Sequence, residues 1–266
     1  MSVRAFPEPD HNPPRVRLEL TSISKDPETN VSRVNPDGST VLVREPVRLT
    51  AGRGNGYDYE SPFELPVTFR ESAAGQESSV PVALGADAVW LTSPFRPGAS
   101  VRLDVASRDV SRLQAGTWQQ RSRPSSRVLV QPYGPRDPIV VTSGGRRGHS
   151  STLTVRTPTD AAANDLANLV DDDRVLWLNV PPSLGLGVES MYVSVGDIDE
   201  VRRDTHGADP VRLWTLPYTR VQRPFGRLRA VWTWDEVPQT FATWEDLEAT
   251  YRTWEDFETD TRRVVG

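Results

Sequence analysis

The sequence predicts a mainly β protein that begins with a β-sandwich. Short segments of alternating polar and apolar residues, of which Arg15–Leu20 is typical, recur along most of the chain. Turn residues such as Asn35–Gly38 separate these segments. About seven such segments fit into the first ~110 residues, and this density of short strands is typical of a sandwich.

The sandwich domain is expected at residues 15–118. Val31–Val34 and Thr40–Val43 form a hairpin around Asn35–Gly38, where proline and glycine occupy the positions that a type I turn prefers. Further strands are expected at Phe63–Arg70, Val80–Leu84, Val89–Thr92 and Val101–Val105. Residues 1–14 contain four prolines and little apolar surface. We therefore expect them to form an N-terminal arm without a regular element or a role in the core.

A second β domain with one helix is expected at residues 119–232. The helix should span roughly residues 158–170, because Thr157 is a good N-cap, Pro158 suits the first helical position and Asp160 completes a capping box. Strands are expected before the helix at Pro138–Thr142 and Thr152–Arg156, and after it at Val175–Val180, Met191–Val195 and Val211–Leu216.

No residue set in the sequence has the pattern of a catalytic, cofactor or metal site. The chain has no cysteine, and its three histidines lie far apart in polar segments. Gly144–Ser151 lacks the Gly-Lys-Ser/Thr ending of a phosphate loop, and Gly52–Gly56 predicts a flexible loop. Asp171–Asp173 lacks the remaining ligands of an EF-hand, so a solvated helix exit is favoured. The sequence predicts a protein that is not an enzyme, although it neither places nor excludes the carboxylate pair of a glycan hydrolase.

Charge and hydropathy also argue against two classes of partner. The arginines are spread along the strands without a clustered basic face, which disfavours nucleic-acid binding. No apolar run approaches 18 residues, and the first 14 residues contain no apolar core of a signal peptide, so neither a membrane span nor secretion is expected.

Tryptophans near the strands leave two interpretations open. Trp90 and Trp177 are flanked by aliphatic residues, which favours positions in the core. The alternative is an aromatic platform for sugar, and a glycan therefore stays a possible partner.

The C-terminal segment, residues 233–266, contains Thr-Trp-acid-acid units that begin at Thr233, Thr243 and Thr253. Each threonine can cap a short helix, with the acidic pair near the positive end of the helix dipole. Between residues 233 and 262 there are nine Asp/Glu and two Arg. Such short helices need an apolar surface to lie on. We expect either the chain's own second domain or a neighbouring subunit to provide it. The candidate interface residues are Trp234, Trp244, Leu247, Tyr251, Trp254 and Phe257.

Several motifs, taken in order, resemble those of actinophage minor tail proteins, or distal tail structural proteins, of siphovirus-like particles. Tyr57–Pro62 followed by Leu65–Arg70 resembles their "DYEAP-x-G-x-x-V-x-Y" segment, with Ser61 in place of the usual small residue. The C-terminal repeats resemble their "TWADL" units. The other matching segments are Val31-Ser32-Arg33, Asp37-Gly38, Val43-Arg44, Trp90-Leu91 with Pro94, Asp137–Val141, Tyr192–Ile198 with Arg202, Leu216-Pro217 and Arg223-Pro224.

The resemblance implies a structural protein of the virion tail, assembled in the host cytoplasm and located near the tail tip. It implies a fibronectin type III-like sandwich, then a β-barrel-like tail domain with one helix, and a C-terminal tail of short helices. The implied partners are further copies in a homo-oligomeric ring or cap, and other tail proteins of the tube, the hub or the tape-measure complex. A host-glycan or receptor-binding module is the alternative function, because it uses similar β folds and aromatic residues.

Overall fold

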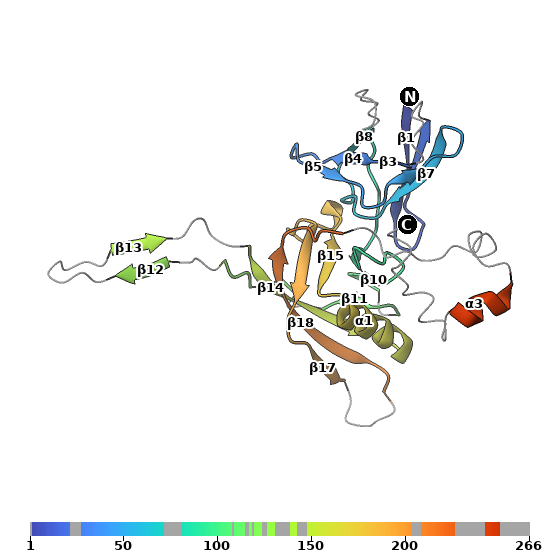
Figure 1. Cartoon of the computed structure of the whole chain (residues 1–266). Coiled ribbons are helices and arrows are strands. Elements are labelled where there is room, and N and C mark those ends of the chain that lie inside the picture. The colour runs from blue at the N-terminus through green and yellow to red at the C-terminus, as the bar shows by residue number, and fades with distance from the viewer. Residues whose placement is uncertain are drawn as a thin grey trace. The chain divides into compact units, whose positions relative to one another are not determined.

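The computed structural model describes residues 2–21, 28–71, 81–107, 109–114, 117–118, 120–123, 127–130, 139–142, 148–203, 209–226 and 243–250 (Figure 1). The chain divides into two compact units, Met1–Pro224 and Phe225–Gly266. The first unit holds all the strands of the described residues, and the second holds helix α3. The prediction of a mainly β protein is confirmed.

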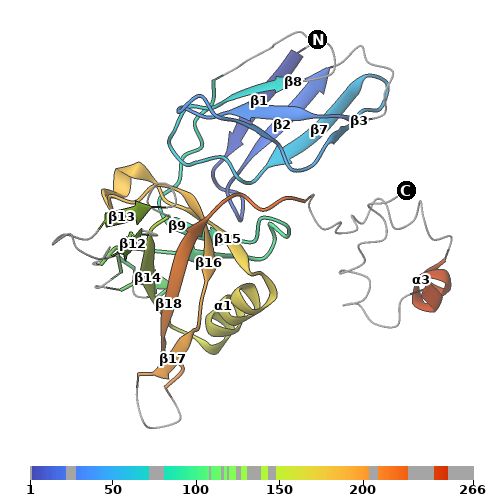
Figure 2. The same ribbon diagram turned by 60° about the vertical axis from the view of Figure 1, so that its left-hand side comes forward.

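A small β-sandwich forms the N-terminal part of the first unit (Figure 2). One antiparallel sheet has the order β1-β2-β7 and a second has the order β5-β4-β8, while β3 and β6 pair with each other. The bounds are β1 Ser2–Glu8, β2 Arg15–Thr21, β3 Glu28–Thr29, β4 Val31–Val34, β5 Thr40–Leu42, β6 Val47–Arg48, β7 Arg53–Asp58 and β8 Thr68–Glu71. Alternate residues of β2, Val16, Leu18 and Leu20, are buried in the same core as Val31 and Phe69.

The hairpin between β4 and β5 confirms the predicted turn. Val34 lies opposite Thr40, and the Gly38 amide donates to the Asn35 carbonyl over 2.9 Å. Gly38 has φ +81°, a backbone angle that glycine adopts without strain.

Two expectations for this region are wrong. Residues 2–8 form strand β1, paired with β2 along its whole length, and Val3 is buried in the core. Pro7 is tolerated because β1 is an edge strand. Most of the Gly52–Gly56 loop belongs to strand β7. Its glycines permit close packing, since a Cβ at Gly54 would lie 2.1 Å from the Arg48 carbonyl oxygen of β6.

The rest of the first unit is built on an eight-stranded sheet, which curls into a half-barrel (Figure 1). Its order is β10-β9-β15-β16-β18-β14-β11, and β17 pairs with β18 off this path. The bounds are β9 Val89–Thr92, β10 Ser100–Leu103, β11 Arg112–Leu113, β14 Ser150–Thr157, β15 Val175–Asn179, β16 Met191–Val195, β17 Asp199–Arg202 and β18 Arg212–Val221.

Helix α1, Asp160–Asp172, covers the core of the half-barrel with Ala163, Leu166, Leu169 and Val170. The predicted helix is confirmed, but Thr159 caps it instead of Thr157. The Thr159 hydroxyl accepts from the Ala162 amide at 3.2 Å.

Strands β9 and β10 were expected in the sandwich but belong to the half-barrel. β9 pairs with β10 on one side and with β15 on the other, about 85 residues further along the chain. Their alternation predicted strands correctly, but it carries no information about a partner so distant in sequence. The domain boundary at residue 118 stays a prediction.

A separate hairpin is formed by β12, Arg127–Val130, and β13, Ile139–Thr142, which pair only with each other among the described strands (Figure 1).

The second unit contains α3, Trp244–Thr250. Thr243 and Asp246 form a reciprocal capping box, because the Asp246 amide donates to the Thr243 hydroxyl at 3.2 Å and the Thr243 amide donates to Asp246 Oδ2 at 3.0 Å. The predicted cap at Thr243 is therefore confirmed.

Candidate functional site at the junction of sandwich and half-barrel

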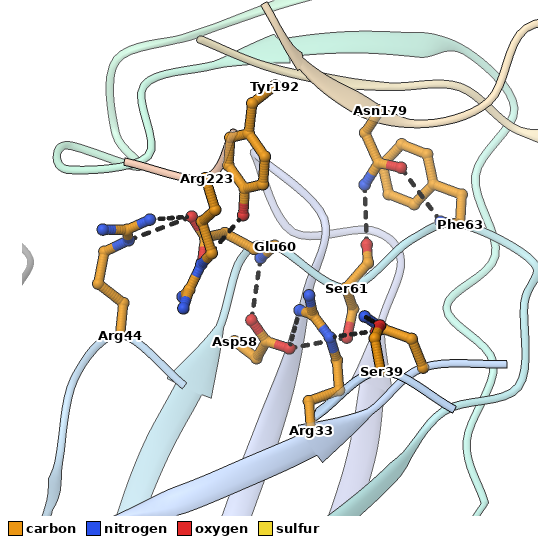
Figure 3. A network of polar contacts seen from close by, with 11 residues as sticks. Arg33, Ser39, Arg44, Asp58, Glu60, Ser61, Phe63, Asn179, Tyr192 and Arg223 are labelled. Atoms are coloured by element: carbon orange, nitrogen blue, oxygen red, sulfur yellow. Dashed lines mark hydrogen bonds and ion pairs between the residues drawn. The ribbon is translucent and has the colours of Figure 1, made fainter. Parts of the chain in front are cut away.

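The segment Asp58–Pro62 leaves the end of β7 and lies where the sandwich meets the half-barrel (Figure 3). We call the contacts of this segment with its surroundings the junction. Asp58 is 2% exposed. Its carboxylate accepts from Arg33 Nη1 at 2.7 Å, from the Ser61 hydroxyl at 2.9 Å and from the Glu60 amide at 3.0 Å. A carboxylate this deeply buried is stable only with such partners.

Glu60 is the centre of the junction, because two arginines from distant parts of the chain share its carboxylate. Arg44 donates to Oε1 from Nε at 3.1 Å and from Nη2 at 2.6 Å, and Arg223 donates to Oε2 from Nε at 3.0 Å. Arg223 also donates from Nε to the Tyr192 hydroxyl at 3.2 Å. Charge-assisted bonds of this kind are the strong ones in proteins.

Electrostatics fix the charge states of Tyr192 and Arg223 near neutral pH. Burial raises the pKa of Tyr192, and the neighbouring Glu60 charge raises it further, so the phenol stays neutral. Burial alone would lower the pKa of Arg223, but the Glu60 charge and hydrogen bonds raise it overall. The Arg223 guanidinium therefore stays charged.

Asn179 ties the half-barrel to the sandwich backbone (Figure 3). Its Nδ2 donates to the Ser61 carbonyl at 2.8 Å, and its Oδ1 accepts from the Phe63 amide at 3.1 Å. The amide thus acts like the backbone of a neighbouring strand. Ser190 fixes its orientation by donating to Oδ1 at 2.7 Å.

Glu64 adds a contact that depends on an uncommon backbone angle, φ +58°. Its carboxylate accepts from the Ser183 amide at 2.7 Å and from the Ser183 hydroxyl at 2.5 Å. Ser183 lies in the short 3₁₀ helix η1, Pro182–Leu184. The strained conformation is retained because it brings the carboxylate to an amide that the helix itself leaves unpaired.

Apolar packing completes the junction. Val89 and Leu91 of β9 face the half-barrel core, whereas Trp90 between them packs into the sandwich core. Trp90 lies opposite Asn179 in the sheet, so the outer face of β9 and β15 is the face that meets the sandwich. Trp177 is buried too, and its ring centroid lies 4.6 Å from the ring centroid of Tyr192. The expectation that Trp90 and Trp177 are core residues is confirmed.

The polar groups of the junction are held by contacts within the first unit. The carboxylates of Asp58 and Glu60 and the amide of Asn179 each make several hydrogen bonds within the junction. Among the described residues, no cluster of three or more His, Cys, Asp or Glu side chains could hold a metal ion. No helix within the described part of the chain is long and apolar enough to cross a membrane.

The candidate interface residues of the C-terminal segment lie in the second unit. Trp244 is 57% exposed, and Leu247, three residues later on α3, is 4% exposed. Four other candidates lie outside the described residues: Trp234, Tyr251, Trp254 and Phe257. Their role stays a prediction.

Sequence reasoning did not find the junction, because it used Tyr57–Pro62 only as a family motif. Two acids beside the end of a buried strand could have indicated buried ion pairs.

Comparison with known proteins gives structural likeness at low sequence identity. No protein-family model matches the sequence, and no curated protein matches it. The chain is similar to a chain in a solved structure described as "Tail of empty GTA particle computed with helical refinement, C6 symmetry". The likeness has a TM-score of 0.28 at 10% identity and covers 51% of this chain and 91% of that chain.

Proposed function

We propose that this protein is a non-enzymatic structural component of the tail of a phage or phage-like particle. It is placed near the tail tip, where it forms a ring or cap with its own copies and contacts other tail proteins of the tube, hub or tape-measure complex. It works without cofactor or metal, in a virion tail assembled in the host cytoplasm.

The observation that carries the proposal is the convergence of six of the tail-protein motifs on the junction. Five of the motifs, spread from residue 31 to residue 224, supply Arg33, Arg44, Asp58 with Glu60, Tyr192 and Arg223. A sixth supplies Trp90. Short motifs that matched by chance would have no reason to meet in space. Their convergence supports the proposal that the resemblance follows the structure of the junction.

A junction held by buried ion pairs suits a tail protein, which must keep two β modules in fixed positions within a symmetric assembly. The junction also holds the end of the first unit. Arg44 donates to the carbonyl of Pro224, the last residue of the first unit, at 3.2 Å, and Arg223 beside it is held by Glu60.

Self-association is supported by the β12–β13 hairpin. Six of its eight strand residues are apolar, and neither strand pairs with any other described strand. A two-stranded hairpin is marginally stable alone in water. A neighbouring subunit of a ring would supply the missing strand or apolar cover, since ring interfaces join different surfaces of identical chains.

The C-terminal segment supplies the second contact. The capping box at Thr243 and the exposed Trp244 fit a short helix that presents an anchor to a partner. We propose Trp234, Trp244, Leu247, Tyr251, Trp254 and Phe257 as the residues of this interface. The alternative glycan-binding function is less well supported, because Trp90 and Trp177 are buried and provide no platform for a sugar.

Labelling of purified particles tests the proposal. Particles carrying a tagged copy of this chain should bind gold-labelled antibody at the tail tip, and particles without the chain should have defective tails. Complete tails in the absence of the chain, together with binding of the free chain to host glycans, would contradict the structural role and favour the alternative.

A further inference from the structure

The outer face of the sheet β1-β2-β7 carries an ordered array of arginines and aromatic rings. In the register of the three strands, Phe6 lies opposite Arg17 and Arg17 lies opposite Tyr57. Because side chains alternate along a strand, every second residue of each strand points to this same face. We define the arginine face as the residues Arg4, Phe6, Glu8, Arg15, Arg17, Glu19, Arg53 and Tyr57.

Contacts within the face hold its side chains in place. Arg15 lies 3.9 Å from the centroid of the Tyr57 ring and donates from Nε to Glu8 at 2.7 Å. Arg17 lies 4.8 Å from the centroid of the Phe6 ring and donates from Nε to Glu8 at 2.9 Å. These side chains lose little conformational freedom when a partner binds, which favours affinity.

The chemistry of the face selects a protein partner with acidic and apolar groups. The guanidinium groups of Arg15 and Arg17 already cover the rings of Tyr57 and Phe6, so those rings are not open platforms for sugars. Four arginines against two glutamates leave two positive charges on the face. Arginine and aromatic residues together are the composition typical of binding hot spots.

The chain itself contains a segment of matching chemistry. Residues 233–262 hold nine Asp/Glu and two Arg, a balance of −7, while the whole chain has −5, so the remainder has +2. In the described part of this segment, Glu245 and Glu248 are exposed beside the exposed Trp244. β2 has seven residues, about 20 Å at the usual rise per residue, and residues 243–258 are long enough to follow it.

We infer that the acidic segment 243–258 of one copy docks on the arginine face of a second copy. Trp244 and its repeat Trp254 act as apolar anchors, and the acids pair with Arg4 and Arg53 at the exposed end of the face. Such a head-to-tail contact extends from copy to copy or closes into a ring. The inference rests on the proposed assembly function and names the partner surface within it.

Charge-reversal substitutions in the full-length chain test the contact. The face variant carries Arg4→Glu and Arg53→Glu, both at exposed positions outside the Glu8 network. The segment variant carries Glu245→Lys and Glu248→Lys. A control variant with Arg123→Glu and Arg174→Glu, exposed positions away from the face, makes the same change in net charge as the face variant. Circular dichroism confirms that each variant is folded, and sedimentation velocity measures association over a wide range of concentration.

The wild-type chain and the control should associate with increasing concentration, while the face and segment variants should each associate at least about tenfold more weakly. An equal mixture of the two variants should associate again, because the unchanged segment of the face variant meets the unchanged face of the segment variant, and the two reversed surfaces are also opposite in charge. A chain carrying all four reversals should associate with itself again.

Three results would overturn the inference: a wild-type chain that stays monomeric at every concentration, a control as weak as the face variant, or a mixture without complexes. If the chain is nevertheless found at the tail tip of particles, the proposed function stands and only this contact is wrong. Replacing Trp244 by alanine in the wild-type chain gives a second readout. It should weaken association without changing the net charge.

Discussion

Removal of the Glu60 charge should destabilise the chain far more than removal of a surface carboxylate. Glu60 and Arg44 have side chains that are each 4% exposed, and Glu60 also binds Arg223. Glu60→Gln keeps the shape but leaves a buried guanidinium without its counter-charge. Loss of one partner of a buried ion pair costs about 3 to 5 kcal/mol. For a chain of this size, each kcal/mol of lost unfolding free energy lowers the thermal unfolding midpoint by about 2 to 4 °C, so the midpoint should fall by about 6 to 20 °C.

Thermal and urea unfolding of matched variants provide the assay. Glu8→Gln is the control, because Glu8 makes the same kind of pair with Arg15 but is 28% exposed, and exposed pairs contribute only about 0 to 1 kcal/mol. A double variant with Arg44→Met should recover part of the loss, since it removes the uncompensated charge. If Glu60→Gln costs no more than Glu8→Gln, the junction is not held by its buried ion pairs and the reasoning is refuted.

Three further predictions concern other parts of the chain. Phe69→Ala should cost about 3 to 5 kcal/mol in urea unfolding, because Phe69 is fully buried in the sandwich core, and a loss below about 1 kcal/mol would show that the core is loosely packed. Thr243→Ala should reduce amide protection in Trp244–Thr250 alone, because it removes one half of the capping box, and unchanged protection would show that the cap is dispensable. The hydrogen bond from Arg15, with the charges of Arg15 and Arg17, lowers the pKa of Glu8 below 4.5. Its stabilising effect should therefore be present above about pH 4.5 and disappear as the pH falls through the lowered pKa. The stability difference between Glu8→Gln and wild type should vanish in acid, and a difference that persists there would contradict this.

Local patterns were enough to predict several elements. The turn residues Asn35–Gly38 specify their hairpin because the turn geometry depends on those residues alone. Alternation in Arg15–Leu20 predicted β2, since one face of this strand is buried and the other is not. The threonine caps predicted α1 within two residues and α3 at its first turn.

Long-range pairing was not predictable from the same patterns. β9 and β15 are apolar on both faces, because the half-barrel core covers one face and the sandwich the other. Such apolar runs predict that a strand is buried, but they do not indicate which strand it pairs with. Strand β1 was missed because Pro7 and the polar neighbours of Val3 weaken its signal, although Val3 is in the core. The junction was hidden because Glu60 and Arg223 are 163 residues apart in sequence.

A density map of the intact particle is the measurement that tests the central claim most directly. The account predicts several copies of this chain in a closed ring or cap at the tail tip, with neighbouring copies in contact. It also predicts that each contact buries more than about 1,000 Å², the size that specific interfaces reach. A map that shows a single isolated copy without contact to another, or a tail tip that lacks the chain, would contradict the account.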